Sequence, residues 1–252
     1  NSVAEVVLHS RTPFAVDSVD ELPPTARGVL FDGFNVVGGC VALAFSGTRE
    51  SRNIYPTGHG ISVEQRALAN GHKSGVLWLT GLSGSGKSTL AMALEQELFK
   101  RGWQAYVLDG DNVRDRLNSD LGFSPNDRSE NIRRVAEVAR LLADSGNIVI
   151  TAFISPYAID RERAREIAPG AFHEIYIKAA VEVCEGRDPK GLYAKARRGE
   201  ISEFTGVDAP YEVPRQPNLV VNTENESVEQ CIETLTSYVD DAFAYVPSEQ
   251  KD

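Results

Sequence analysis

The residues best suited to chemistry lie in the octapeptide "GLSGSGKS", residues 81–88. It fits the pattern G-x-x-x-x-G-K-[S/T], with Gly81, Gly86, Lys87 and Ser88 at the defined positions. In this pattern, glycines let backbone N–H groups curl around phosphates, the lysine spans the β- and γ-phosphates, and the serine hydroxyl binds Mg²⁺. An apolar stretch precedes this phosphate loop and a helical pattern follows it, as the motif requires. We therefore predict a nucleoside triphosphate site.

Three enzyme classes use such a site: small-molecule kinases, GTPase switches, and motor or assembly ATPases. A GTPase would normally carry an N-K-x-D motif that reads guanine, and no such string occurs in the sequence. Motor ATPases usually have an apolar strand that ends in Asp-Glu, whereas the apolar stretch 147–155 ends in "FIS". The sequence favours a kinase that acts on a small molecule.

The segment "LDGDNVR", residues 108–114, offers a site for the phosphoryl acceptor. Asp109 and Asp111 follow an apolar stretch, and in extended chain both side chains would point to one side of a strand end that neighbours the phosphate loop. One carboxylate would organise Mg²⁺ through water, and the other would accept the proton of the attacking hydroxyl. The alternative is that Asp-Gly-Asp-Asn only builds a turn, which is compatible with function.

This segment ends with Arg114, and Arg128 and Asn131 follow it. Arg128 and Asn131 are three residues apart on a predicted helix and share one face of it. Together with Arg114 they would form a cradle for an anionic substrate. A single arginine is more often a solvated surface residue, but three polar residues after the Asp-Gly-Asp turn favour binding.

The elements that position these residues form an α/β pattern. Turn residues bound five apolar stretches, which predict buried strands over residues 75–80, 104–110, 147–155, 173–178 and 218–223. Amphipathic helical patterns alternate with them, so we predict a parallel sheet with helices on both faces.

Three helices have clear boundaries in the sequence. One is predicted over residues 87–101, where leucines recur every four residues and Gly102 ends the helix. A second begins with Ser124 as the N-cap and Pro125 at the first helical position. The last begins with a capping box in "SVEQ", residues 227–230.

Residues 1–50 have a different pattern, with Val, Leu and Phe broken by Gly and Asp-Gly turn signals. We predict a small all-β module here, a partial barrel, followed by a kinase domain over residues 51–252. The module is too short to close a barrel alone, so its edges would pair with something else. Because the first residue is Asn1 rather than Met, we expect the chain to be processed or part of a longer one.

Composition excludes several classes of function. The 252 residues carry a formal net charge of -10, which argues against a nucleic-acid binder. No apolar run is long enough to cross a membrane, and no secretory signal begins the chain. Cys40, Cys184 and Cys231 have no metal-ligand spacing, so we expect reduced, buried cysteines in a cytoplasmic protein.

The chain from about Asn53 onward resembles the adenylylsulfate kinases. The resemblance is carried, in order, by "GLSGSGKST", "LDGDNVR", "LGFS", "DRSENIRRVAEVARLLADSG", "FISPY", "DRERAR", "VCEGRDPKGLYAKARRGEI" and "FTGVDAPYEVP". It implies a P-loop NTPase kinase fold and ATP with Mg²⁺ as cofactor. The implied reaction transfers the γ-phosphate to the 3′-hydroxyl of adenosine 5′-phosphosulfate and yields 3′-phosphoadenosine 5′-phosphosulfate.

The resemblance also implies a role for each matching residue. The catalytic residues would be Asp111, Lys87 and Ser155, the last of which matches a serine proposed in this family to carry a phosphoryl group. ATP would be bound by Gly81, Leu82, Ser83, Gly84, Ser85, Gly86, Lys87, Ser88 and Thr89, with the metal on Ser88. The sulfated substrate would be bound by Asp109, Arg114, Phe123, Arg128, Asn131, Ile154, Lys190 and Phe204. Direct in-line transfer needs no covalent intermediate, so we expect Ser155 only to hydrogen-bond a phosphate.

Within the substrate site, Phe123 and Phe204 would stack on the two faces of the adenine. Ile154 would contact this base through its backbone. Lys190 would contact an anion at the base of a mobile lid, about Arg187 to Pro210, whose Lys, Arg, Gly and Pro residues suit closure over two polyanions.

The chain departs from the family pattern at two places. Asp115 stands where the family commonly has His, and Ser202 and Glu203 replace a Lys-Gly pair next to Phe204. The second change removes a cation and adds a carboxylate beside an anionic substrate, and we expect it to weaken substrate binding or to shift lid closure.

Residues 1–50 weakly resemble the end of the last β-barrel domain in the GTPase subunit of sulfate adenylyltransferase. The resemblance implies a bifunctional fusion, with sulfate adenylyltransferase subunits or a second copy of the chain as partners. The alternative is an independent β appendage used for oligomer contacts.

Two other functions stay open from the sequence. One is another small-molecule kinase of the same fold, of the gluconate or shikimate type. The other is a nucleotide-binding regulatory domain of a sulfate-activation complex, for which the altered lid is the only support.

Overall fold

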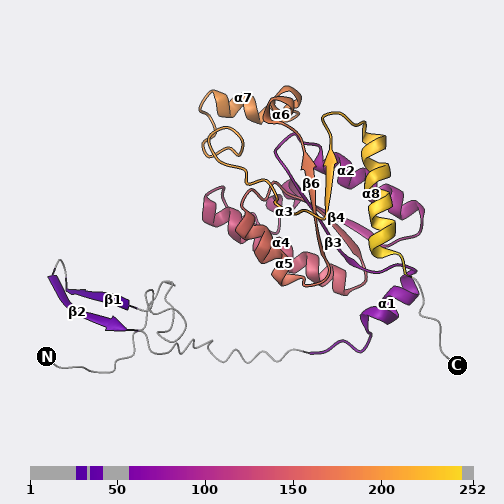
Figure 1. Cartoon of the computed structure of the whole chain (residues 1–252), viewed down its shortest axis with the longest axis horizontal. Helices are drawn as coiled ribbons and strands as arrows, with labels where there is room; N and C mark the ends of the chain where they lie inside the picture. Colours follow the sequence, from indigo (N-terminus) through magenta and orange to yellow (C-terminus); the bar gives the residue numbers. More distant parts are fainter. Residues whose placement is uncertain (1–26, 33–34, 42–56, 246–252) are drawn as a thin grey trace. The chain divides into compact units, whose positions relative to one another are not determined.

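The computed structural model describes residues 27–32, 35–41 and 57–245. The chain divides into two compact units, Asn1–Gly58 and His59–Asp252 (Figure 1). In the first unit, β1 (Arg27–Asp32) and β2 (Asn35–Val41) pair as an antiparallel hairpin with an irregularity between Leu30 and Phe31. The remainder of the predicted β module lies outside the described residues, and so does the partial barrel.

The second unit contains a five-stranded parallel sheet in the order β4-β5-β3-β6-β7. Its strands are β3 (Gly75–Thr80), β4 (Ala105–Asp109), β5 (Ile148–Ala152), β6 (Phe172–Lys178) and β7 (Leu219–Asn222). All five predicted strands are confirmed, although β5 ends three residues earlier than expected.

Helices cover both faces of this sheet, as predicted (Figure 1). On one face, α2 (Lys87–Lys100) and α8 (Val228–Phe243) pack in one apolar cluster with Leu77 and Leu79 of β3. On the other face, α4 (Pro125–Asp144) and α5 (Ala158–Ile167) pack with the alternate residues of the same strand. Every residue of β3 is buried, because a central parallel strand is covered on both sides.

Local capping explains where the helices begin. The Ser124 hydroxyl accepts the Asp127 N–H at 3.2 Å to start α4, and Ser227 and Gln230 form the predicted capping box of α8. A further capping box, not predicted, starts α1 (Val63–Asn70) at Ser62. The remaining helices are short: α3 (Gly110–Asp115), α6 (Val181–Arg187) and α7 (Leu192–Arg197).

The position of β4 refines the expectation for the acceptor segment. Since β5 lies between β3 and β4, the strand that ends in Asp109 is not hydrogen-bonded to the strand that leads into the phosphate loop. A side chain makes the connection instead, because the Ser88 hydroxyl donates to the Asp109 carboxylate at 2.6 Å.

The cysteines are free, and Cys184 and Cys231 are buried as expected. The expectation is wrong for Cys40, which is only half-buried in the β1–β2 hairpin, where a two-stranded ribbon provides little cover. No helix in the described part of the chain is long and apolar enough to cross a lipid bilayer.

Candidate active site

The phosphate loop has the backbone that its glycines allow. Gly81, Gly84 and Gly86 have φ angles of 156°, 75° and 101°. A Cβ on Gly81 would lie 2.4 Å from the Ile177 carbonyl oxygen, and one on Gly84 would lie 2.8 Å from that of Cys184. Only glycine fits at these two positions, and the loop leads directly into the N-terminus of α2, which favours anions.

The lysine of the loop is buried inside it. The Lys87 ammonium donates to the Leu82 carbonyl at 2.6 Å and lies 3.5 Å from the Ser85 hydroxyl. Burial lowers the pKa of Lys87 to about 8, and this effect outweighs the attraction of nearby acidic groups, including Asp109. The side chain is therefore a cation that a phosphate would stabilise strongly.

Asp109 connects the phosphate loop to the acceptor segment. Its Oδ2 accepts the Ser88 hydroxyl at 2.6 Å, and its Oδ1 accepts the backbone N–H of Asp111 at 3.0 Å. A hydroxyl and a carboxylate are hard oxygen donors of the kind that Mg²⁺ takes together with substrate phosphates and water. Among the described residues, no cluster of three or more His, Cys, Asp or Glu could hold a metal by itself. The residues present therefore fit a metal that arrives with the nucleotide.

Asp111 lies in the first turn of α3, with Asp109 as the N-cap. The expectation that both carboxylates follow one side of an extended chain is therefore wrong, because the Asp109 side chain caps a helix at this point. The Asp111 side chain is 70% exposed and forms an ion pair with Lys190 of the lid. Asp111, the proposed base, and Lys190, the proposed anion contact, are therefore in direct contact.

Phe123 is a platform for the two predicted arginines. The Arg114 guanidinium lies 4.6 Å from the centre of the ring and that of Arg128 lies 5.8 Å from it. Arg114 also donates to the Gly122 carbonyl at 2.8 Å, and burial together with the charge of Arg128 lowers the pKa of Arg114. Within residues 57–245, no carboxylate forms an ion pair with either guanidinium. Two neighbouring guanidinium groups without an ion-paired carboxylate are suited to bind an anion.

Asn131 shares α4 with Arg128 but forms no hydrogen bond with Arg128 or Arg114 within residues 57–245. It is buried, and its Oδ1 accepts the Asn118 side-chain amide at 2.9 Å. The Asn118 Oδ1 is itself buried without a partner among the described residues. Asn118 was not predicted from the sequence, because a single Asn in a polar turn gives no signal of its burial.

The lid rests on the phosphate loop. The Tyr193 hydroxyl donates to the Ser83 carbonyl at 3.0 Å, and Arg187 donates to the Gly84 carbonyl at 3.4 Å. Phe204 is buried in the core of the lid and packs edge-on against Tyr193, with ring centres 5.0 Å apart.

The two phenylalanines predicted to hold adenine therefore differ, since Phe123 is 63% exposed and Phe204 is buried. Arg128 connects the two segments that carry these rings. Its Nε donates to the Phe123 carbonyl and its Nη2 donates to the Glu203 carbonyl, both at 2.9 Å. This arginine fastens the start of α4 to the turn of the lid that carries Phe204.

Glu203 occupies an unusual backbone conformation, with a φ of 56° in the left-handed region. The Asp208 carboxylate holds this turn by accepting the N–H groups of Glu203 at 2.8 Å and Phe204 at 2.6 Å. The left-handed region favours glycine, so Glu203 is strained where the family pattern commonly has Gly.

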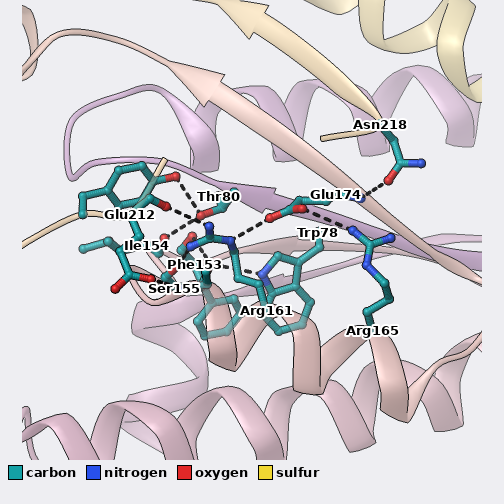
Figure 2. A network of polar contacts seen from close by, with 12 residues as sticks. Trp78, Thr80, Phe153, Ile154, Ser155, Arg161, Arg165, Glu174, Glu212 and Asn218 are labelled. Atoms are coloured by element: carbon teal, nitrogen blue, oxygen red, sulfur yellow. Dashed lines mark hydrogen bonds and ion pairs between the residues drawn. The ribbon is translucent and has the colours of Figure 1, made fainter. Parts of the chain in front are cut away.

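Ile154 and Ser155 lie on the loop after β5 (Figure 2). The Ile154 carbonyl accepts the Thr80 hydroxyl at 2.7 Å, so this part of its backbone is already bonded. Ser155 is 2% exposed, with a φ of 41°, and its hydroxyl accepts the Trp78 indole N–H at 3.1 Å. The Ser155 hydroxyl thus faces the core.

Comparisons with known proteins show which family the chain is similar to. A family model described as adenylylsulphate kinase matches residues 73–222. The adenylyl-sulfate kinase of Staphylococcus carnosus is 56% identical over 193 residues, which are 76% of this chain and 97% of that protein. That of Geotalea daltonii is 58% identical over 173 residues, which are 68% of this chain and 85% of that protein.

Solved structures give the same result. The Mycobacterium tuberculosis APS kinase CysC in complex with AMPPNP and APS has a TM-score of 0.65 and 48% identity, covering 66% of this chain and 98% of that one. A hexameric APS kinase from Thiobacillus denitrificans has a TM-score of 0.51 and 31% identity, covering 66% of this chain and 28% of that one.

The low pKa of Lys87 predicts a pH-dependent affinity for ATP. The free lysine loses its proton as the pH rises through about 8, whereas bound phosphates keep it protonated. Binding above this pH therefore requires proton uptake, and affinity is expected to fall by up to about tenfold per pH unit. Isothermal titration with Mg-ATP between pH 7 and 9.5 measures the slope. In Lys87→Arg, which stays charged, the slope should vanish; equal slopes in both proteins, or a flat profile in the wild type, would contradict this assignment.

The backbone of Glu203 predicts a gain in stability for Glu203→Gly. Glycine removes the left-handed strain and is expected to raise the free energy of unfolding by about 0.5–1 kcal/mol. Glu203→Gln is the matched control, since it removes the charge but keeps the strain, and urea unfolding compares the two. An equal gain in the glutamine variant would assign the effect to charge and refute the backbone explanation.

Proposed function

The chain belongs to the adenylylsulfate kinase family, and on that premise we propose that it transfers the γ-phosphate of ATP to the 3′-hydroxyl of adenosine 5′-phosphosulfate. The product is 3′-phosphoadenosine 5′-phosphosulfate. The observation that carries the proposal is the direct connection between a phosphate loop and an anion site through Asp109 and α3. A site of this kind holds two polyanions side by side, one as donor and one as acceptor.

The donor half binds ATP through the phosphate loop. Backbone N–H groups and the Lys87 ammonium surround the phosphates, and Lys87 exchanges the Leu82 carbonyl for phosphate oxygens. Ser88 and Asp109 would hold Mg²⁺, which supplies charge neutralisation on the phosphate oxygens when bound. Tyr193 and Arg187 keep the lid against the loop and exclude water.

The acceptor half binds the sulfated nucleotide. Arg114 and Arg128 supply the two positive charges for the phosphosulfate, and Phe123 offers an exposed ring for the flat base. Asp111 accepts the proton of the 3′-hydroxyl as the hydroxyl attacks. Lys190, which pairs with Asp111 in the structure, moves to the incoming phosphates and frees the carboxylate.

A coupled assay of ATP-dependent 3′-phosphorylation tests the proposal, with gluconate and shikimate as control acceptors. We expect turnover with adenosine 5′-phosphosulfate and none with the two controls. Turnover of a control would support the other small-molecule kinases, and nucleotide binding without turnover of any acceptor would support the regulatory alternative.

A further proposal concerns the partners of the chain. We infer that residues 1–50 are the end of a fused β-barrel domain and that sulfate adenylyltransferase subunits are partners; the described hairpin fits this and does not test it. The hexameric state of the Thiobacillus denitrificans kinase supports self-association of this chain. A cytoplasmic location and the domain boundary at residue 50 stay predictions.

Asp111→Asn tests the assignment of the base. The variant keeps the size of the side chain but loses proton acceptance, so kcat is expected to fall by about 10²–10⁴-fold with the KM for ATP unchanged. Asp115→Asn at the other end of α3 is the control, because the Asp115 side chain is exposed and its ion pair within the described residues is a 4.0 Å contact with Arg116. Wild-type turnover in Asp111→Asn would refute the base, and an equal loss in the control would show a general effect on α3.

Ser155→Ala tests direct transfer against a phosphorylated serine. Because the hydroxyl is buried against Trp78, we expect kcat to fall by less than about tenfold, the scale of one lost hydrogen bond. Mass spectrometry of the acid-quenched wild type should find no phosphate on the peptide that contains Ser155. Accumulation of that phosphopeptide, together with loss of turnover in the variant, would establish a covalent intermediate.

A further inference from the structure

A single buried guanidinium joins three segments of the kinase unit (Figure 2). Arg161 of α5 is 3% exposed and forms an ion pair with Glu174 of β6, with Nε 2.6 Å from Oε1. Its Nη1 donates to the Ser155 carbonyl and its Nη2 to the Glu212 carbonyl, both at 2.8 Å. Glu174 neutralises the charge, and the two remaining donor groups bind backbone oxygens on different segments.

A second set of contacts runs parallel to the first. The Thr80 hydroxyl at the end of β3 donates to the Ile154 carbonyl at 2.7 Å and lies 3.0 Å from the Tyr211 hydroxyl. The Glu212 N–H donates to the Pro156 carbonyl at 2.9 Å. Residues 154–156 are therefore connected to residues 211–212, directly and through the side chains of Thr80 and Arg161. We call this set of hydrogen bonds the seam.

The seam lies at the ends of two segments of the proposed site. Residues 211–212 directly follow the proposed lid, and residues 154–156 follow β5 and include Ile154, which is predicted to contact the acceptor base; we call residues 154–156 the acceptor-side loop. Ser155 has a φ of 41°, a conformation that persists only where several contacts hold it. Arg161 on its carbonyl and Trp78 on its hydroxyl supply these contacts.

We propose that Arg161 is a positioning residue. Through the seam, it fixes the C-terminal end of the lid to the acceptor-side loop, so that these two segments keep one position relative to each other. The proposal rests on the proposed function, because the acceptor is taken to be adenosine 5′-phosphosulfate. Arginine suits this role since its planar fork binds three partners at once and keeps its charge at every relevant pH. A lysine would keep the ion pair with Glu174 but cannot span both carbonyls.

Arg161→Lys and Arg165→Lys form a matched pair. Arg165 also bonds Glu174, at 3.2 Å, but its side chain is 42% exposed and no bond to either carbonyl is present. In Arg161→Lys, kcat/KM for adenosine 5′-phosphosulfate is expected to fall by about 10–100-fold, with the KM for ATP within about threefold of wild type. Arg165→Lys should keep both constants within about twofold.

Tyr211→Phe keeps the proposal testable if Arg161→Lys does not fold. It retains the ring against Tyr176 and removes only the hydroxyl near Thr80. We expect it to raise the KM for adenosine 5′-phosphosulfate in the same direction as Arg161→Lys, by a smaller factor.

Trp78 supplies a readout that does not depend on turnover. In a Trp103→Phe background it is the remaining tryptophan, and its indole bonds Ser155. Arg161→Lys is expected to shift its emission, whereas Arg165→Lys should not. If the wild type does not phosphorylate adenosine 5′-phosphosulfate, the proposed function fails, and this emission still decides whether Arg161 holds the loop.

Three results would overturn the proposal. The first is wild-type kinetics for the sulfated substrate in folded Arg161→Lys or in Tyr211→Phe. The second is an equal loss for ATP and adenosine 5′-phosphosulfate, which would indicate general destabilisation. The third is an Arg165→Lys variant as impaired as Arg161→Lys, which would assign the effect to the charge on Glu174.

Discussion

The candidate site depends on the two hydrogen bonds accepted by Asp109. One carboxylate oxygen accepts the hydroxyl of Ser88 at the start of α2, and the other accepts the N–H of Asp111 and thereby begins α3. Because β5 separates β4 from β3, no backbone ladder joins the phosphate loop to the acceptor segment. This carboxylate makes that connection. It also sets the direction of α3, and with it the positions of Asp111 and Arg114.

The charge of the site differs from that of the chain. The protein carries a formal net charge of -10, yet Lys87, Arg114 and Arg128 gather at one end of the sheet. Burial makes the charges of Lys87 and Arg114 costly in the absence of a ligand, as the lowered pKa values of these two side chains indicate. Under the proposed function, the two anionic nucleotides relieve this cost, and the free energy so gained contributes to their binding.

Local patterns predicted most of the fold. The five strands, the ends of α2 and the caps of α4 and α8 follow from residues close together in the sequence. The strand order, the helical setting of Asp111 and the burial of Asn118 were not predicted, because contacts between distant segments decide them. Arg161 shows the limit most clearly: its partners Glu174 and Glu212 lie 13 and 51 residues away, and nothing around it marks burial.

A crystal structure with a non-hydrolysable ATP analogue and adenosine 5′-phosphosulfate tests the central claim most directly. The account predicts the sulfated nucleotide on Arg114, Arg128 and Phe123, with its 3′-oxygen within hydrogen-bond distance of the Asp111 carboxylate and Lys190 released from that carboxylate. A second nucleotide bound elsewhere, or a 3′-oxygen beyond the reach of Asp111, would contradict it.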